Sequence, residues 1–126
     1  MLLCAKYILP VTSAPFEDGA ILVRDGRICD IGKIDALKLR YPEEEVVDYG
    51  LAALMPGLID AHTHLENSVM RGLVHDVPYA TWMRAVAECS TKMDASGWYH
   101  SAVLGGLDAL SSGITTVADT PAVRAA

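Results

Sequence analysis

Residues 56–64 read Pro-Gly-Leu-Ile-Asp-Ala-His-Thr-His, a short apolar run that ends in two histidines. Such a run predicts a strand, and side chains two residues apart on a strand point to the same side. His62 and His64 should therefore lie next to each other, with Thr63 facing away. Most isolated histidine pairs of this kind are surface or core histidines, but two neighbouring imidazoles at a strand end are also suitable nitrogen ligands for a divalent metal ion. We predict that His62 and His64 are metal ligands.

Two helices are predicted downstream of the histidines. Residues 78–89 fit one helix, with Pro78 at its start. A second helix runs to Leu110, and either Asp94 or Ser96 is suited to be its N-cap because both side chains can accept a bond from a free backbone N–H. Apolar residues recur along this second segment at helical spacing.

A second strand is predicted over residues 114–118, ending at Asp119. The stretch is apolar and β-branched, as in a strand that is buried on both faces. Gly113 lies where a helix would end in a left-handed cap. The order strand, helices, strand indicates a parallel βαβ unit, so residues 56–126 are predicted to begin an α/β domain.

The N-terminal part reads as β structure. Asp25-Gly26 lies between two apolar segments and predicts a hairpin with a type I′ turn, which needs positive φ at both central residues. Residues 43–45, three glutamates, are expected to form a solvated acidic surface. Residues 1–55 are therefore predicted to be a small antiparallel β domain. Its expected strands are 2–9, 20–24, 27–31, 46–48 and 51–55, with one or two helical turns at 35–41.

Composition narrows the classes of protein that fit. The chain has 126 residues, is 52% hydrophobic and 21% charged, and carries a net charge of −6. This balance is that of a folded domain rather than a disordered chain. The acidic surplus argues against nucleic-acid binding, which needs a basic surface. No apolar run approaches the ~18 residues of a membrane helix, so no membrane partner is expected.

The cysteines predict neither a disulfide framework nor a thiolate metal site. Cys4, Cys29 and Cys89 are widely spaced and odd in number. We expect each to be a small buried side chain in a protein of the reducing cytoplasm.

The segment ending in His62 and His64 resembles the metal-binding signature of the amidohydrolase superfamily. Further segments are similar to its branch of aminohydrolases and chlorohydrolases, which act on purines, pyrimidines, triazines and related heterocycles. These segments are Ser68, Arg71-Gly72-Leu73, Asp76-Val77-Pro78, Trp82-Met83 and Ser112–Asp119. The resemblance covers essentially the whole chain.

The resemblance implies the start of a (β/α)₈ barrel preceded by a small β-sandwich, which in this family is usually built from both termini. It also implies one divalent metal ion, zinc or iron, which makes a water molecule nucleophilic. The ligands would be the His-x-His pair of the first strand, a histidine of the fifth and an aspartate of the eighth. His62 and His64 match the first pair, and no catalytic residue is assigned within this chain.

Several residues near the histidine pair are candidates for the pocket, of which Trp82 follows from the resemblance. Trp82 matches a tryptophan near the substrate, although a core tryptophan on an amphipathic helix is an equal alternative. Glu66 is predicted to contact the substrate or to cap the next turn. Arg71 is expected either to bind a substrate anion or to form a structural ion pair, and Asp60 to brace the strand or a ligand. His100 is expected to be exposed, and His75 is expected to be an exposed loop residue, with lining of a pocket as the alternative.

Substrate choice is left open by one departure from the adenosine-type deaminases of this branch. These use a glutamate after the tryptophan to hold the ribose. Thr91 occupies the matching position here, and Glu88 lies three residues earlier. A free base, a triazine or another small amidine therefore remains as possible as a nucleoside.

The predicted function is hydrolytic deamination or dechlorination of a nitrogen heterocycle. A complete barrel takes ~250 residues, whereas residues 56–126 accommodate about two strand–helix units. We therefore expect an N-terminal portion of a longer protein, acting as a homo-oligomer or with a companion chain that completes the barrel. The alternative is a non-catalytic assembly module that cannot complete the metal site.

Overall fold

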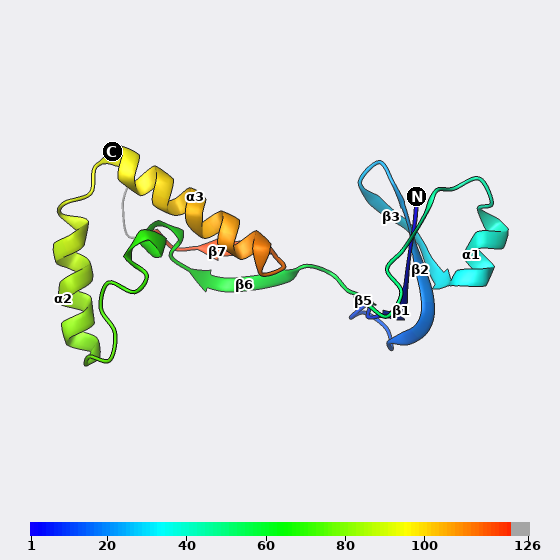
Figure 1. The fold of residues 1–126 in the computed structure, drawn as a ribbon, viewed down its shortest axis with the longest axis horizontal. Coiled ribbons are helices and arrows are strands. Elements are labelled where there is room, and N and C mark those ends of the chain that lie inside the picture. Colours follow the sequence, from blue (N-terminus) through cyan, green and yellow to red (C-terminus); the bar gives the residue numbers. More distant parts are fainter. Residues whose placement is uncertain (122–126) are drawn as a thin grey trace. The chain divides into compact units, whose positions relative to one another are not determined.

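The structure is a computed structural model that describes residues 1–121. The chain divides into two compact units, one of residues 1–56 and one that begins at Gly57 (Figure 1). Each unit is described by itself below.

A five-stranded sheet forms the first unit. Its strands are β1 (Leu2–Ile8), β2 (Phe16–Arg24), β3 (Arg27–Lys33), β4 (Val46–Asp48) and β5 (Ala53–Leu54). The order is β3-β2-β1-β4, and β5 also pairs with β1. The first three strands are antiparallel, but β4 and β5 run parallel to β1. The prediction of a wholly antiparallel domain is therefore wrong, because the chain crosses through a helix before returning to β1. Within residues 1–56 there is one sheet, not the two layers of a sandwich.

One helix, α1 (Ile34–Arg40), supplies the core of this unit. Leu37 projects from α1 and is only 1% exposed. It packs with residues of β1 and β2 that are equally buried: Leu2, Cys4, Ala20 and Leu22. Alternating positions on the two strands thus meet one helical side chain, which closes a small apolar core.

The hairpin between β2 and β3 has the predicted turn, since Asp25 and Gly26 have φ of 50° and 69°. The strands then lose register: Leu22 pairs with Asp30, but Val23 pairs with Ile28. Cys29 is the extra residue of this bulge. Its thiol is exposed and contacts the Arg27 carbonyl oxygen at 3.7 Å, which corrects the prediction that it is buried.

The other two cysteines behave differently. Cys4 is buried, as predicted, and burial raises the pKa of its thiol. Cys89 is partly buried, and all three thiols are free.

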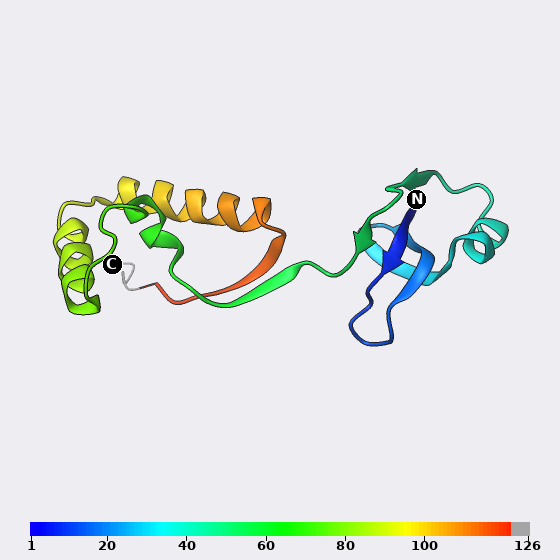
Figure 2. The same ribbon diagram turned by 60° about the horizontal axis from the view of Figure 1, so that its bottom comes forward.

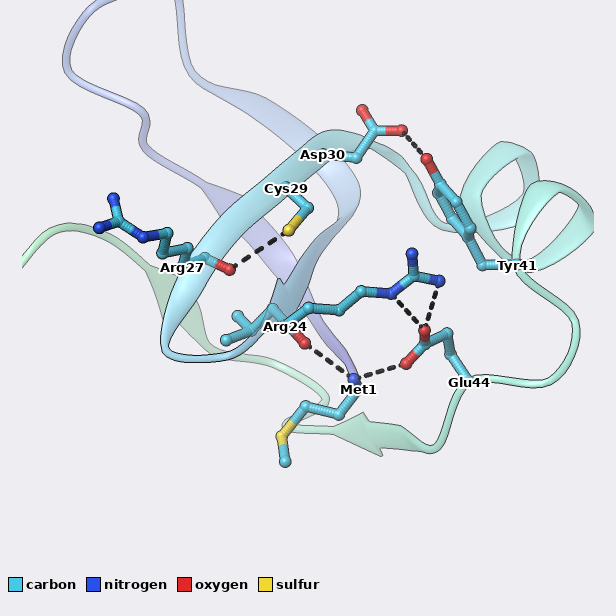
Figure 3. A network of polar contacts seen from close by, with 8 residues as sticks. Met1, Arg24, Arg27, Cys29, Asp30, Tyr41 and Glu44 are labelled. Atoms are coloured by element: carbon cyan, nitrogen blue, oxygen red, sulfur yellow. Dashed lines mark hydrogen bonds and ion pairs between the residues drawn. The ribbon is translucent and has the colours of Figure 1, made fainter.

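A polar network surrounds the N-terminal amine (Figure 3). The Met1 ammonium donates to the Val23 carbonyl at 2.9 Å and to Glu44 Oε2 at 2.7 Å. Arg24 Nε donates to Glu44 Oε1 at 2.7 Å. These two cations lower the pKa of the Glu44 carboxyl, the amine contributing most. The Glu44 side chain is only 19% exposed, so the prediction of a wholly solvated acidic surface fails at this residue.

The second unit has two parallel strands, β6 (Leu58–Thr63) and β7 (Ile114–Asp119), as the sequence predicts. Between them lie three helices: the 3₁₀ helix η1 (Leu65–Met70), α2 (Tyr79–Ser90) and α3 (Ala95–Ser111). Helix η1 was not predicted from the sequence. In both views η1 lies beside α3, and the two are in contact (Figures 1 and 2).

The ends of α3 follow the predicted signals. Asp94 Oδ1 accepts a bond from the Gly97 N–H at 2.7 Å, so Asp94 rather than Ser96 is the N-cap. After the helix, Gly113 has φ 79°, which agrees with the predicted left-handed cap. Within residues 1–121, no helix combines the length and apolar character that crossing a membrane would require.

The predicted double burial of residues 114–118 is wrong for the described part of the chain. Three of these five residues, Thr115, Thr116 and Ala118, are exposed. Among residues 1–121, the strand pairs only with β6 and is covered on one face by α3.

Candidate metal centre

Two imidazoles lie side by side where β6 ends. Thr63 is the last residue of the strand, and His64 precedes η1 directly. The ring centroids of His62 and His64 are 5.1 Å apart, and the ring planes are nearly perpendicular at 88°. Both side chains are exposed. The two exposed imidazoles are thus in edge-to-face contact at the end of β6.

A bulge in β6 helps to set this geometry. Asp60 pairs with Val117 and Thr63 pairs with Asp119, so β6 has one residue more than β7 in this interval. Asp60 Oδ1 accepts a bond from the His62 backbone N–H at 3.1 Å. This is the predicted bracing of the strand by Asp60, and bulges commonly re-aim side chains beside functional sites.

The end of β7 holds the turn that follows the histidines. The Thr63 carbonyl accepts bonds from Thr120 N–H and from Thr120 Oγ1, both at 2.9 Å. Asp119 Oδ1 accepts the Leu65 N–H at 3.1 Å. From the sequence, Asp119 was predicted only as a strand end. Its position at the carboxyl end of a parallel strand was the available signal that it belongs to this region.

Helix α3 holds η1, the segment that follows His64, through contacts of Ser101 and Gly105. Ser101 Oγ donates to the Glu66 carbonyl at 2.5 Å and accepts the Val69 N–H at 2.9 Å. Ser101 is 2% exposed. One turn further along α3, a Cβ on Gly105 would lie 2.9 Å from the Leu65 carbonyl oxygen, so only glycine allows this approach. Neither residue was identified from the sequence.

Glu66 is an acidic residue in contact with His64. It is 5% exposed, and its Oε1 lies 3.7 Å from His64 Nδ1. A buried carboxylate is costly unless donors or cations surround it. The structure places the Glu66 carboxylate beside His64, which can carry a positive charge, at the end of β6.

The other predicted pocket residues have partners of their own. Trp82 lies on α2, is 38% exposed and stacks on Tyr79, with centroids 5.9 Å apart. Arg71 forms an ion pair with Asp108 at 2.6 Å, so it takes the structural alternative of the two predicted roles.

The remaining two histidines are exposed, as predicted. His75 lies before α2, with Nδ1 3.2 Å from Asp76 Oδ2. His100 lies on α3, where Nδ1 is 2.7 Å from the Ser96 carbonyl oxygen. These contacts are local, within four residues.

A polar cavity of about 400 Å³ lies between β6, η1, α3 and β7. Arg71 and Asp108 line it with Asp60, Thr63 and Ser68, whereas neither His62 nor His64 does. This space is therefore separate from the face that carries the imidazoles.

The donor set fits a divalent metal ion in part. Imidazole nitrogens suit zinc and iron, and the paired rings supply two of them. Catalytic zinc sites use three protein ligands. Within residues 1–121, no cluster contains three or more His, Cys, Asp or Glu side chains able to hold a metal ion. This part of the chain thus offers two ligands.

Comparison with protein families gives two matches. The model described as "Amidohydrolase family" matches residues 53–126, and the model described as "Imidazolonepropionase-like composite domain, bacteria" matches residues 19–43. A curated relative is 5-methylthioadenosine/S-adenosylhomocysteine deaminase of Nitratidesulfovibrio vulgaris (strain DP4). It is 34% identical over 104 residues, which are 82% of this chain and 24% of the relative. The chain spans about a quarter of the length of the curated relatives that it matches.

Solved structures are also similar to this chain over nearly its whole length. Atrazine chlorohydrolase of Arthrobacter aurescens TC1, complexed with zinc, is 27% identical with a TM-score of 0.77, over 94% of this chain and 28% of that one. Guanine deaminase of C. acetobutylicum, with guanine bound in its active site, has a TM-score of 0.78 over 98% of this chain and 30% of that one. At 18% identity, the second likeness concerns the fold alone.

Proposed function

The chain belongs to the amidohydrolase family, and from this premise we propose that its protein is a metal-dependent hydrolase. The proposed reaction replaces an amino or chloro group on a nitrogen heterocycle with an oxygen from water. It breaks a non-peptide carbon–nitrogen bond in the first case and a carbon–chlorine bond in the second.

The observation that carries this proposal is the pair of adjacent imidazoles, 5.1 Å apart at the end of β6. His62 and His64 would hold one divalent metal ion, zinc or iron, together with further ligands from the complete protein. The ion, when bound, supplies a water molecule made nucleophilic near neutral pH. The zinc complex of the chlorohydrolase relative supports this choice of cofactor.

The chain's own residues would mainly fix the positions of the two rings. Asp60 restrains the backbone at His62, and Asp119 and Thr120 restrain the segment from Thr63 to Leu65. Such restraint matters because displacing a reacting group by about 1 Å can cost ~100-fold in rate. On this proposal the carboxyl end of the strand pair is the floor of the active site.

Trp82 is proposed as a substrate-side residue. Its ring is partly exposed and already stacked on Tyr79, which leaves an aromatic surface on α2. Aromatic surfaces of this kind bind flat heterocycles by stacking. A direct substrate contact for Glu66 is less well supported, because that side chain is buried against His64.

The proposed substrate is a small aminated or chlorinated heterocycle. Nucleosides are included among the compounds to be tested below. The deaminase relative acts on 5-methylthioadenosine and S-adenosylhomocysteine by its name, and the chlorohydrolase on atrazine. Thr91, at the position where the ribose-binding glutamate is expected, caps the end of α2, and its Oγ1 donates to the Glu88 carbonyl. This favours substrates without a ribose.

We further propose that β6, α3 and β7 belong to a (β/α)₈ barrel that the complete protein closes. The exposed apolar side chains of α3, which are Val103, Leu104, Leu107 and Leu110, support this. A homo-oligomer, or a companion chain, would serve the same purpose.

The test is turnover by the zinc- or iron-loaded protein. The panel contains 5-methylthioadenosine, adenosine, guanine, cytosine and atrazine, with ammonia and chloride release as readouts. His62→Ala and His64→Ala should each abolish turnover and metal occupancy. His100→Ala, an exposed histidine of α3, should change neither, because its ring contacts only its own helix turn in the described structure.

Wild-type metal content in either β6 variant would disprove the ligand assignment. Metal binding without turnover of any panel member would favour the alternative, a non-catalytic assembly module.

A further inference from the structure

A carboxylate lies behind one of the two proposed ligands. Glu66 Oε1 is 3.7 Å from Nδ1 of His64, and the two side chains differ sharply in exposure: 7% for Glu66 and 40% for His64. The carboxylate is thus on the protein side of the imidazole, while the ring itself reaches solvent.

The backbone around Glu66 is held on both sides. Ser101 of α3 donates to its carbonyl oxygen, and Gly105 of α3 lets the Leu65 backbone approach closely. One residue before it, the Leu65 N–H bonds to Asp119 of β7. The backbone that carries the Glu66 side chain is therefore fixed against α3 and β7.

An imidazole bound to a metal ion through one nitrogen commonly donates its other N–H to a carboxylate. That partner fixes the tautomer and the ring orientation and makes the ligating nitrogen more basic. At His64, Nδ1 is the nitrogen in contact with the carboxylate, at 3.7 Å, which is ion-pair distance and slightly longer than a hydrogen bond, so a small turn of either side chain would complete the bond.

We propose that Glu66 is a positioning residue: it accepts the Nδ1–H of His64 and so leaves Nε2 of that ring for the metal ion. This inference rests on the proposed function only in its use of the metal. The contact between Glu66 and His64 does not depend on it.

The test compares zinc affinity and the His64 tautomer in matched variants. Glu66→Gln keeps an acceptor oxygen without the charge, and Glu66→Leu removes both. Glu88→Gln is the control, since that side chain is 73% exposed on α2. Zinc affinity is measured by competition with a chelator, and the tautomer by nitrogen-15 NMR of the metal-free protein.

We expect zinc affinity to fall ~10-fold to 100-fold in Glu66→Leu, less in Glu66→Gln, and not at all in Glu88→Gln. His64 should carry its proton on Nδ1 in the wild type and lose this preference in Glu66→Leu. If Glu66→Leu does not fold, the zinc affinity and tautomer of Glu66→Gln decide.

Unchanged zinc affinity and an unchanged tautomer in the Glu66 variants would overturn the proposal, and a raised KM alone would make Glu66 a substrate contact instead. Failure of the proposed function looks different, because His62→Ala and His64→Ala would then bind zinc like the wild type. In that case, the tautomer measurement still tests whether Glu66 keeps the His64 proton on Nδ1.

Discussion

Each of the two units is stabilised internally by a different kind of interaction. In residues 1–56, five side chains from two strands and α1 are at most 1% exposed and form an apolar core. Among residues 57–121, the buried residues are Glu66, Met70, Ser101 and Gly105, of which only Met70 has a large apolar side chain, while Leu104 and Leu107 of α3 are exposed. The first unit relies on apolar packing, and the second, where the candidate site lies, on specific polar contacts and close backbone approach.

Because of this difference, the stability of the first unit and the geometry of the candidate site in the second depend on different interactions. Apolar burial stabilises in proportion to area and tolerates small displacements. Hydrogen bonds act only over a narrow range of distance and angle. Mutations in the first unit should therefore change only the free energy of unfolding, whereas mutations where α3 meets η1 in the second unit should change metal affinity as well. The predictions below test that division.

The largest stability effect is expected at Leu37. Leu37→Ala should lower the free energy of unfolding of the first unit by ~2–5 kcal/mol, because it empties the centre of the core. Urea unfolding followed by circular dichroism measures this loss. Leu39→Ala, on the same helix but 85% exposed, should change the value by less than ~0.5 kcal/mol. Equal effects at both positions would mean that the first unit has no packed core.

Next in size is Gly105, where α3 meets the Leu65 backbone. Gly105→Ala should destabilise the second unit by ~1–3 kcal/mol and weaken zinc binding, because its methyl group has no room. Both tryptophans lie in this unit, so their fluorescence reports its unfolding. Gly106→Ala has open space and should be neutral or stabilising by up to ~1 kcal/mol. Zinc affinity that stays constant in Gly105→Ala would contradict the link between α3 and the site.

Gly113 tests the connection from α3 to β7. Gly113→Val should destabilise by ~1–2 kcal/mol, because a β-branched residue is strained at φ 79°. Thermal melting of the two proteins provides the comparison. An unchanged melting temperature would argue against the left-handed cap.

A smaller effect is expected at the start of α3. Asp94→Ala removes the acceptor for the Gly97 N–H and should cost ~1 kcal/mol. Ser96→Ala should cost less, since Ser96 lies inside the helix. Urea unfolding of both variants ranks them, and the reverse order would restore Ser96 as the cap.

The smallest effect concerns pH and the first unit. The folded-state pKa of Glu44 is lowered, so its ion pairs contribute stability above the carboxyl's usual pKa and lose it as the pH falls through the lowered value. The urea midpoint of the wild type should therefore fall more steeply on acidification than that of Glu44→Gln. Parallel pH profiles would show that this network contributes nothing measurable.

Local features of the fold were predictable from the sequence. Asp25-Gly26 indicated its turn, Gly113 its positive φ, and periodicity the helices α2 and α3, because each depends on neighbours within a few residues. The parallel placement of β4 and β5 was not predictable, since it depends on where the chain returns after α1.

The same limit applies to the candidate site. His62 and His64 were visible as a motif, but several of the contacts that hold the segment after them join residues more than thirty positions apart. Ser101 contacts η1 from α3, and Asp119 reaches back to Leu65. No local pattern encodes such pairs. The exposed Cys29 was missed because a bulge displaces it, and Glu44 because its partners include the N-terminal amine.

The bulged end of β6 also constrains how this segment can evolve. His62 and His64 flank Thr63, whose carbonyl oxygen accepts two hydrogen bonds from Thr120. Inserting or deleting one codon before Thr63 would turn both rings to the opposite face and put a hydroxyl in their place. Related genes should therefore tolerate substitutions around the pair far better than changes in length.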